Sequence, residues 1–344
     1  RSDDLQRWID ALPANVLDEH PRLMRFRAMI STELGRYAEA EEMLVPAYQA
    51  YVDRDSKVGM ARVLVQMAIV QRLQERYLEA IESCKAVINL IRDSDEPAAV
   101  IRAYQNLGIC YQVLGDPVLG QQQMRRALEL AQTHGDTVSA AFIAHDLGNS
   151  LYIEGSVDEA RRYFHQALLH WRKIGNPGDL AMTLQALGLI HHHQGEYAEA
   201  QNRYEESLEK ARDSHNRRLE AYALLNSGDL QRDQGHIARA LELYEEALEV
   251  ASTVGQSGLM LYILAAQGDA YRLQQDLARA SQTLTEALDQ SERQGLEEPL
   301  ALSHLAFGAL AIQERAFDVA EEHLQTALAL LQRVGMQRDV GRAH

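Results

Sequence analysis

Residues 181–200 decide the fold, and they read AMTLQALGLI HHHQGEYAEA. Up to Ile190, apolar residues return every three or four positions, as they do on one face of a helix. The break Gln194-Gly195-Glu196 follows, and a second helical pattern starts after it. Gly195 suits a helix C-terminus because glycine reaches positive φ without strain. The stretch therefore predicts two helices joined by a tight turn.

This hairpin pattern recurs along the whole chain with a period of forty residues. Two columns of small residues and one of larger residues keep the register. The first small column is Gly108, Gly148, Gly188, Gly228, Gly268 and Gly308. The second is Ala40, Ala80, Gly120, Ala160, Ala200, Ala240, Ala280 and Ala320. The larger column is Leu44, Cys84, Met124, Phe164, Tyr204, Tyr244, Leu284 and Leu324. We expect the small residues of two helices to face each other and the larger residue to fill the gap to the next unit. The spacing predicts an all-α superhelix (solenoid) of about eight helical hairpins, whose stacked neighbours bury a continuous core.

The repeats also predict how the chain is organised. Residues 1–20 would form the second helix of a preceding partial repeat, with a turn at Leu12-Pro13. Eight repeats would follow at about 21–60, 61–100, 101–140, 141–180, 181–220, 221–260, 261–300 and 301–338, and 339–344 would be a truncated tail. We expect one continuous domain, because repeats have no natural boundary.

Composition argues against several classes of protein. The chain has 344 residues, with 50 acidic against 34 basic side chains and a net charge of −16, so we expect no direct contact with nucleic acid. No apolar run approaches the ~18 residues of a membrane span, so no membrane partner is expected. Cys84 and Cys110 cannot form a disulfide framework, which favours a cytoplasmic location and buried, inert thiols. The chain starts at Arg1 instead of Met, which suggests a mature product or an excised fragment.

The columns resemble the tetratricopeptide repeat, whose pattern is a bulky residue, Leu-Gly, an aromatic, an alanine, an aromatic and another alanine. The third unit carries Tyr104, Leu107-Gly108, Tyr111, Gly120, Met124 and Ala127 at these positions. The resemblance covers nearly the whole chain and implies a right-handed α-α superhelix. Two features depart from the family: the usual repeat has about 34 residues, and the late proline is absent here.

The N-terminus narrows the resemblance. Trp8, Leu12-Pro13 and Pro21 are similar to the start of the sensor region in the MalT-like group of large LuxR-type (LAL/STAND) bacterial transcription activators. This resemblance implies a region that senses an inducer or partner in its concave groove, next to nucleotide-binding and helix-turn-helix domains that are not in this sequence. No Gly-x-x-x-x-Gly-Lys-Ser/Thr loop is present. The alternative is a peptide-binding adaptor or scaffold unrelated to transcription, since Asn106-Leu107-Gly108 resembles the groove asparagines of the cell-polarity repeats.

The resemblance places the first helix of each repeat on the concave face and so selects candidate ligand-binding residues. They are Arg102, Gln105, Asn106, Phe142, His145, Asp146, Asn149, Tyr152, Gln185, His192, Tyr222, Asn226, Asp229 and Arg232. Amide, imidazole and phenol groups of this kind bond peptide backbones or sugar hydroxyls. The partner would be a peptide, a protein or a small-molecule inducer, with an oligosaccharide possible; the alternative is a solvated face. The groove also starts basic, at Arg22, Arg25, Arg62, Arg72 and Arg102. Self-association through the ends of the array is a further possibility.

Other constellations favour structural roles. His191, His192 and His193 point about 100° apart on a helix and cannot chelate one ion, so no metal site is expected. Asp229 and Arg232 lie three residues apart, as do Asp269 and Arg272, and we expect each pair to form an ion pair. We find no nucleophile motif and no enclosed carboxylate pair, so we expect neither enzyme activity nor a cofactor.

Overall fold

The computed structural model describes residues 20–91 and 96–334. These residues form sixteen α-helices and no strands. The predicted all-α fold of stacked tetratricopeptide-like hairpins is confirmed for this part of the chain. The helix expected within residues 1–19 and the tail at 339–344 lie outside the described residues.

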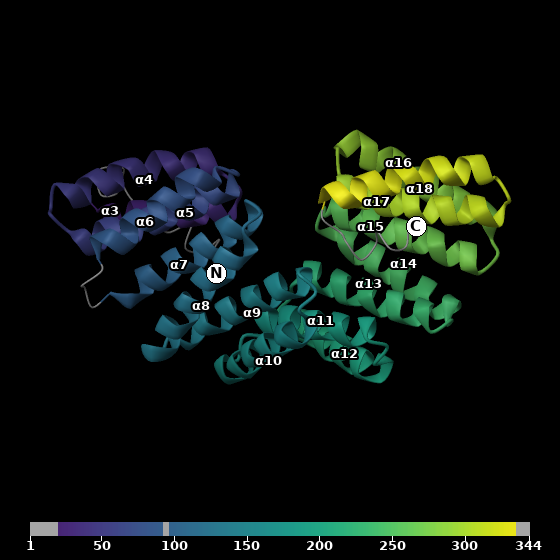
Figure 1. Cartoon of the computed structure of the whole chain (residues 1–344), viewed down its shortest axis with the longest axis horizontal. Helices are drawn as coiled ribbons and strands as arrows, with labels where there is room; N and C mark the ends of the chain where they lie inside the picture. Colours follow the sequence, from purple (N-terminus) through teal and green to yellow (C-terminus); the bar gives the residue numbers. More distant parts are fainter. Residues whose placement is uncertain (1–19, 92–95, 335–344) are drawn as a thin grey trace. The chain divides into compact units, whose positions relative to one another are not determined.

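The chain separates into two compact units, unit 1 at Arg1–Ile174 and unit 2 at Gly175–His344. Figure 1 labels the helices of each unit. Unit 1 contains α3 (Pro21–Glu33), α4 (Tyr37–Val52), α5 (Lys57–Leu73), α6 (Tyr77–Leu90), α7 (Pro97–Val113), α8 (Pro117–Thr133), α9 (Thr137–Ile153) and α10 (Val157–Ile174). Unit 2 contains α11 (Pro177–His193), α12 (Tyr197–Asp213), α13 (Arg217–Asp233), α14 (Ile237–Thr253), α15 (Ser257–Leu273), α16 (Leu277–Gln294), α17 (Glu297–Gln313) and α18 (Phe317–Val334).

Odd-numbered helices are the first helices of the hairpins, and even-numbered helices are the second. Within each unit every first helix packs against its own second helix and against the first helix of the next hairpin. Within each unit, each of the first three second helices also contacts the following first helix. The first helices of a unit therefore form one continuous face, here called its groove face.

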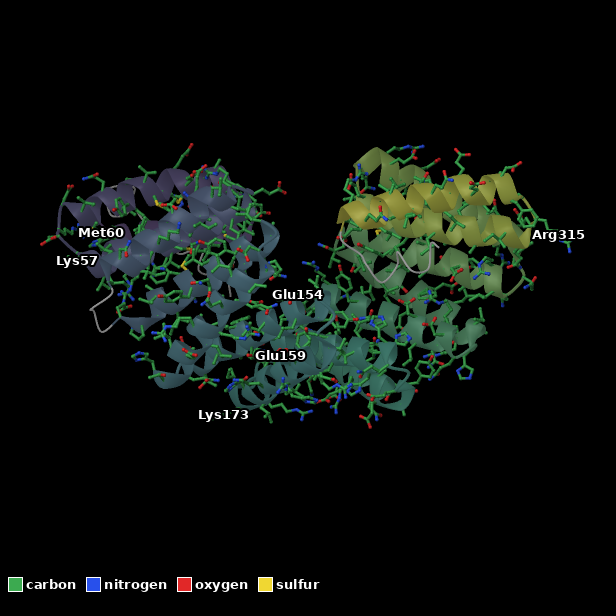
Figure 2. The ribbon with its side chains drawn as sticks, in the orientation of Figure 1. Lys57, Met60, Glu154, Glu159, Lys173 and Arg315 are labelled. Atoms are coloured by element: carbon green, nitrogen blue, oxygen red, sulfur yellow. The ribbon has the colours of Figure 1, made fainter. Side chains whose placement is uncertain are left out.

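The turns inside and between hairpins confirm the predicted glycine positions. Gly195 has φ +75° and Gly175 has φ +76°, both in the left-handed region. At equivalent positions five other residues adopt the same conformation: Asp55, Glu75, His215, Gln275 and Arg315. Arg315 lies at the turn between α17 and α18, with its side chain directed outward (Figure 2). The turn geometry thus follows the forty-residue period even where glycine is missing.

The small glycine column makes room for the larger column, in an arrangement that differs from the expected one. A Cβ added at Gly188 would lie 2.5 Å from the Tyr204 ring, and one at Gly148 would lie 2.7 Å from the Phe164 ring. Each large side chain therefore covers the glycine of its own hairpin, instead of only filling the gap to the next unit. Tyr204 and Phe164 are almost completely buried there. This contact sets how closely the two helices of a hairpin approach.

Local capping and burial support the same elements. The Asp116 carboxylate accepts a hydrogen bond of 3.0 Å from the Leu119 N–H, as expected for an N-cap ahead of a first-position proline. Cys84 and Cys110 are free and buried. Burial and, to a smaller extent, the nearby Cys110 raise the pKa of the Cys84 thiol to about 12, so this thiol stays protonated near neutral pH.

Candidate ligand-binding groove of unit 2

A groove of about 530 Å³ opens on the groove face of unit 2. Its lining comes from the four first helices α11, α13, α15 and α17. The lining residues are Leu189, His192, His193, Leu225, Asn226, Asp229, Arg232, Asp233, Tyr262, Ala265, Ala266, Asp269, Leu273, Leu302, Leu305 and Ala306. A volume of this size falls within the ~300–1,000 Å³ typical of ligand pockets.

The forty-residue period explains why these side chains meet. Leu189, Asp229 and Asp269 occupy one column, and Leu225, Ala265 and Leu305 occupy another. Equivalent residues on successive first helices project from the same helix face, so each column becomes a stripe along the groove. Four of the predicted site residues line this groove together: His192, Asn226, Asp229 and Arg232.

An ionic network forms the polar part of the groove. The Arg232 guanidinium lies 3.1 Å from Asp229, 2.9 Å from Asp233 and 4.0 Å from Asp269. Burial disfavours the charge of Arg232, but the three carboxylates outweigh it and raise the pKa of the guanidinium. Arg272 pairs with Asp269 at 2.8 Å. The two predicted i,i+3 ion pairs are therefore confirmed.

The network extends to a histidine and a tyrosine. His192 Nε2 lies 3.1 Å from an Asp233 carboxylate oxygen, and His192 is buried. Burial of Asp233 favours its neutral form, but the His192 hydrogen bond and the Arg232 charge outweigh this effect and lower its pKa to about 2. Tyr244 donates a hydrogen bond of 2.7 Å to Asp229 from the second helix α14. The orientation of the carboxylates is thus fixed from several sides.

Leucines form the apolar part of the groove. Leu225 and Leu305 are buried, and Leu189 and Leu302 are half-buried beside them. Tyr262 adds an aromatic face, and its hydroxyl donates to Glu298. The Asn226 side chain, half-buried in the lining, makes no hydrogen bond to any residue of 20–91 or 96–334. Its donors and acceptor therefore face the groove unsatisfied, where a ligand or water can bond them.

The other two predicted site residues of unit 2 lie outside this lining. Gln185 donates a hydrogen bond of 2.8 Å to the Leu219 carbonyl oxygen, which ties α11 to α13. Tyr222 is half-buried, and the Arg218 guanidinium lies 5.8 Å from its ring centroid. Both side chains are therefore committed to contacts within the unit.

The predicted site residues of unit 1 are mostly engaged in packing and internal hydrogen bonds. Asn106 is buried, accepts from Arg72 at 3.0 Å and donates to the Arg102 carbonyl oxygen at 2.9 Å. Gln105 donates to Asp146 at 2.7 Å. Burial raises the pKa of the Asp146 carboxyl, while the bond from Gln105 and the charge of Arg72 oppose this rise.

The remaining residues of this group divide between packed and open positions. His145 is buried against the Phe164 ring, and burial lowers its pKa to about 4. Phe142 packs edge-on against Trp171, with ring centroids 4.7 Å apart. Arg102, Phe142 and Asn149 are exposed and Tyr152 is half-buried. These three exposed residues are the predicted site residues of unit 1 that are most open to solvent.

Four polar residues of the groove are not among the predicted site residues: His193, Asp233, Tyr262 and Asp269. Tyr262 and Asp269 lie forty residues after the predicted residues Tyr222 and Asp229, so the repeat period alone was enough to find them. Asp233 follows Arg232 directly and lies outside the groove columns. Its approach to His192 depends on the packing of α11 against α13, which the repeat period does not predict.

The described residues offer neither a metal site nor a membrane-spanning helix. Within residues 20–91 and 96–334, no three His, Cys, Asp or Glu side chains come together as a metal site would require. None of the described helices has the length and apolar character needed to cross a bilayer.

Family models match most of the chain. Tetratricopeptide-repeat models match residues 59–133, 139–213 and 180–253, and a second tetratricopeptide-repeat model matches 225–297. This chain belongs to the tetratricopeptide-repeat family. None of the curated proteins compared with it gives a significant match.

Several solved tetratricopeptide-repeat structures share the fold at low sequence identity. The apo quorum sensor NprR from B. thuringiensis superposes with a TM-score of 0.71 and 14% identity, over 96% of this chain and 92% of NprR. A STAND (signal transduction ATPase with numerous domains) protein with a tetratricopeptide repeat sensor, from Pyrococcus horikoshii, superposes with a TM-score of 0.67 and 15% identity. The match covers 100% of this chain and 54% of that protein. A Rap protein complexed with competence and sporulation factor superposes with a TM-score of 0.62 and 12% identity. The match covers 95% of this chain and 96% of the Rap protein.

Proposed function

We propose that this tetratricopeptide-repeat chain is a non-catalytic sensor region that binds an extended peptide in the groove of unit 2. One observation carries the proposal: a groove of about 530 Å³ that combines leucine side chains, a fixed ionic network and the unsatisfied amide of Asn226. Apolar walls with a few oriented polar groups are the usual composition of a ligand site.

A peptide fits this composition better than an oligosaccharide. The leucines offer apolar area to side chains, whereas the Asn226 amide can bond a peptide N–H and C=O at once. The three carboxylates outnumber Arg232 and Arg272 in the network, so this part of the groove favours a peptide amine or a basic side chain. A sugar would leave much of the leucine surface uncovered.

We place this sensor in a cytoplasmic MalT-like transcriptional regulator of the LuxR type. Three neighbours support the general role: one is called a quorum sensor, one carries a tetratricopeptide repeat sensor, and one is complexed with competence and sporulation factor. The Trp8 to Pro21 stretch supports the narrower assignment. A nucleotide-binding domain before this region and a helix-turn-helix after it in the parent protein would be its direct test.

The second candidate function is a peptide-binding adaptor unrelated to transcription. The open amide of Asn226 supports an adaptor equally well, because a hydrogen bond from this amide to a peptide requires no switch domain. The two readings differ in the parent protein: an adaptor would carry neither a nucleotide-binding nor a helix-turn-helix domain.

The binding site can be tested with matched variants. The intact chain would be screened against peptide and oligosaccharide libraries, and the best peptide measured by calorimetry. Asn226→Ala copies Ala186, Ala266 and Ala306, which occupy the equivalent positions, so the fold should survive. We expect a loss of roughly fivefold to tenfold in affinity, as for one lost hydrogen bond.

Asn202→Ala, on the exposed face of the second helix α12, is the control and should leave affinity unchanged. Unchanged binding by Asn226→Ala would place the peptide elsewhere. Selection of sugars instead of peptides would refute the proposed ligand class.

A further inference from the structure

Four arginines gather on the groove face of unit 1, outside the groove described above. Arg22 and Arg25 lie on α3, Arg62 on α5 and Arg102 on α7; together they are called the arginine cluster. Helix α5 packs against both α3 and α7. Arg22, Arg62 and Arg102 occupy the same repeat position, so their side chains project from the same face of three successive first helices.

Arg25 interacts electrostatically with the other three arginines of the cluster. Its guanidinium carbon lies 4.8 Å from the Phe26 ring centroid, and that of Arg22 lies 5.6 Å from the same ring. Burial lowers the pKa of Arg25, and the charges of Arg62, Arg102 and Arg22 lower it further. All three therefore lie within electrostatic reach of Arg25.

The cluster is poorly neutralised. Arg62 pairs with Glu96 at 2.7 Å, and this is the one carboxylate bound to the four guanidinium groups within residues 20–91 and 96–334. Arg25 instead contacts the Met29 sulfur at 3.3 Å, a weak acceptor. Four positive charges against one negative charge leave a local excess of three, in a chain whose net charge is −16.

Packing does not require arginine at these positions. The equivalent residues of unit 2 are Met182, Tyr222, Tyr262 and Leu302 in one column, and Gln185, Leu225, Ala265 and Leu305 in the other. The same hairpins form with all of these residues. Mutual repulsion of unpaired charges destabilises a folded chain. The four arginines thus lower the stability of the fold and are not needed for packing. We therefore infer that they serve to bind a ligand.

We propose that the arginine cluster is a binding site for a compact anion carrying two or more negative charges, such as a phosphate ester or a di- or tricarboxylate. Guanidinium groups bind both chemistries with paired, charge-assisted hydrogen bonds. Three further arginines within electrostatic reach of Arg25 suit a compact anion better than a long acidic chain. This site is independent of the peptide groove in unit 2.

Pyrophosphate and citrate are suitable probes for the intact chain, at an ionic strength held constant with sodium chloride. We expect saturable binding by calorimetry and a rise in melting temperature for at least one of them. Tighter binding of pyrophosphate would identify a phosphate ester as the natural chemistry. Tighter binding of citrate would identify a carboxylate.

Two variants copy residues that the chain itself uses at the same repeat positions. Arg25→Leu repeats Leu225, and Arg102→Tyr repeats Tyr222. Each should weaken anion binding by roughly tenfold or more, as expected for one lost charge-assisted pair. Each should also raise the melting temperature without anion, because repulsion is relieved. Arg126→Gln, from an exposed pair with Glu129 on α8, should change neither.

Three results would overturn the proposal. The first is that neither probe binds beyond the effect of chloride at equal ionic strength. The second is that Arg25→Leu binds as tightly as the unmodified chain, and the third is that Arg126→Gln loses as much affinity as Arg25→Leu. Binding of an acidic peptide without binding of either small anion would replace the proposed ligand with a different class.

Discussion

Single residues fix the close approach of helices and the shape of the turns. Gly188 lies under the Tyr204 ring, where a Cβ would come within 2.5 Å. Glu75 occupies a turn position with φ +62°, where Gly35, Gly115 and Gly155 stand in other hairpins. The first position needs glycine for space, and the second favours it for conformation.

Gly188→Ala should destabilise the chain by about 1–3 kcal/mol, the usual cost of overpacking a filled site. Gly178→Ala is the control, because its added Cβ would meet no atom closer than 3.7 Å. Urea unfolding of both variants measures the difference. Equal stabilities would mean that Tyr204 moves aside at no cost.

Glu75→Gly should stabilise the chain by about 0.5–1 kcal/mol. Glycine relieves the ~1–2 kcal/mol strain of a left-handed side-chain residue, less the added entropy of the unfolded chain. The reverse change, Gly115→Glu at the equivalent position with φ +86°, should destabilise it. Thermal or urea unfolding tests both, and a shift of the same sign in the two variants would contradict the explanation.

A buried histidine makes unit 1 sensitive to acid. The pKa of His145 is about 4 in the folded chain, against ~6.5 in an unfolded one. The unfolded chain therefore binds the proton first as the pH falls, and stability declines between about pH 6.5 and pH 4. Linkage gives a loss of about 2 kcal/mol between pH 7 and pH 5.

His145→Gln should remove this part of the pH dependence, because Gln105 and Gln185 occupy the equivalent positions without titrating. His134→Gln, at an exposed histidine of the same unit, is the control. Unfolding free energies at pH 7 and pH 5 are compared for each variant. A pH dependence that persists in His145→Gln would assign the effect to other groups.

At the scale of elements, the groove depends on how neighbouring first helices bring charged stripes together. Arg232 on α13 reaches Asp269 on α15, while Asp233 on α13 meets His192 on α11. The same contacts that shape the candidate ligand site thus also join three hairpins. A ligand bound there as proposed would therefore also stabilise the contacts between these hairpins.

Arg232→Gln should destabilise the chain by about 3 kcal/mol, because Asp229, Asp233 and Asp269 lose their shared cation. Arg239→Gln breaks an exposed pair with Glu242 on α14 and should cost about 0–0.5 kcal/mol. Urea unfolding of the two variants measures the difference between these losses. Similar small losses would show that water replaces the Arg232 contacts.

At the scale of the whole molecule, the chain contains two compact units of four described hairpins each. Repeat proteins gain stability mainly from neighbouring repeats. We therefore expect fragments 1–174 and 175–344 each to fold, with helical circular dichroism and cooperative unfolding. The first should retain anion binding and the second peptide binding, and an unfolded fragment would disprove its independence.

The sequence by itself determined the fold, because the small and large columns recur at a fixed interval and each satisfies a local steric need. Gly188, Gly195 and Ala200 already specify a hairpin, whereas the contact of Tyr204 with Gly188 is known only from the structure. It also selected His192, Asn226, Asp229 and Arg232 as groove residues. Only the tertiary structure decided which polar residues stay open. Asn106 and His145 share helix faces with groove residues, yet both are buried, Asn106 beside Arg72 of the preceding hairpin and His145 against Phe164 of its own second helix. Burial depends on side chains that are distant in the sequence, and no local pattern records those contacts.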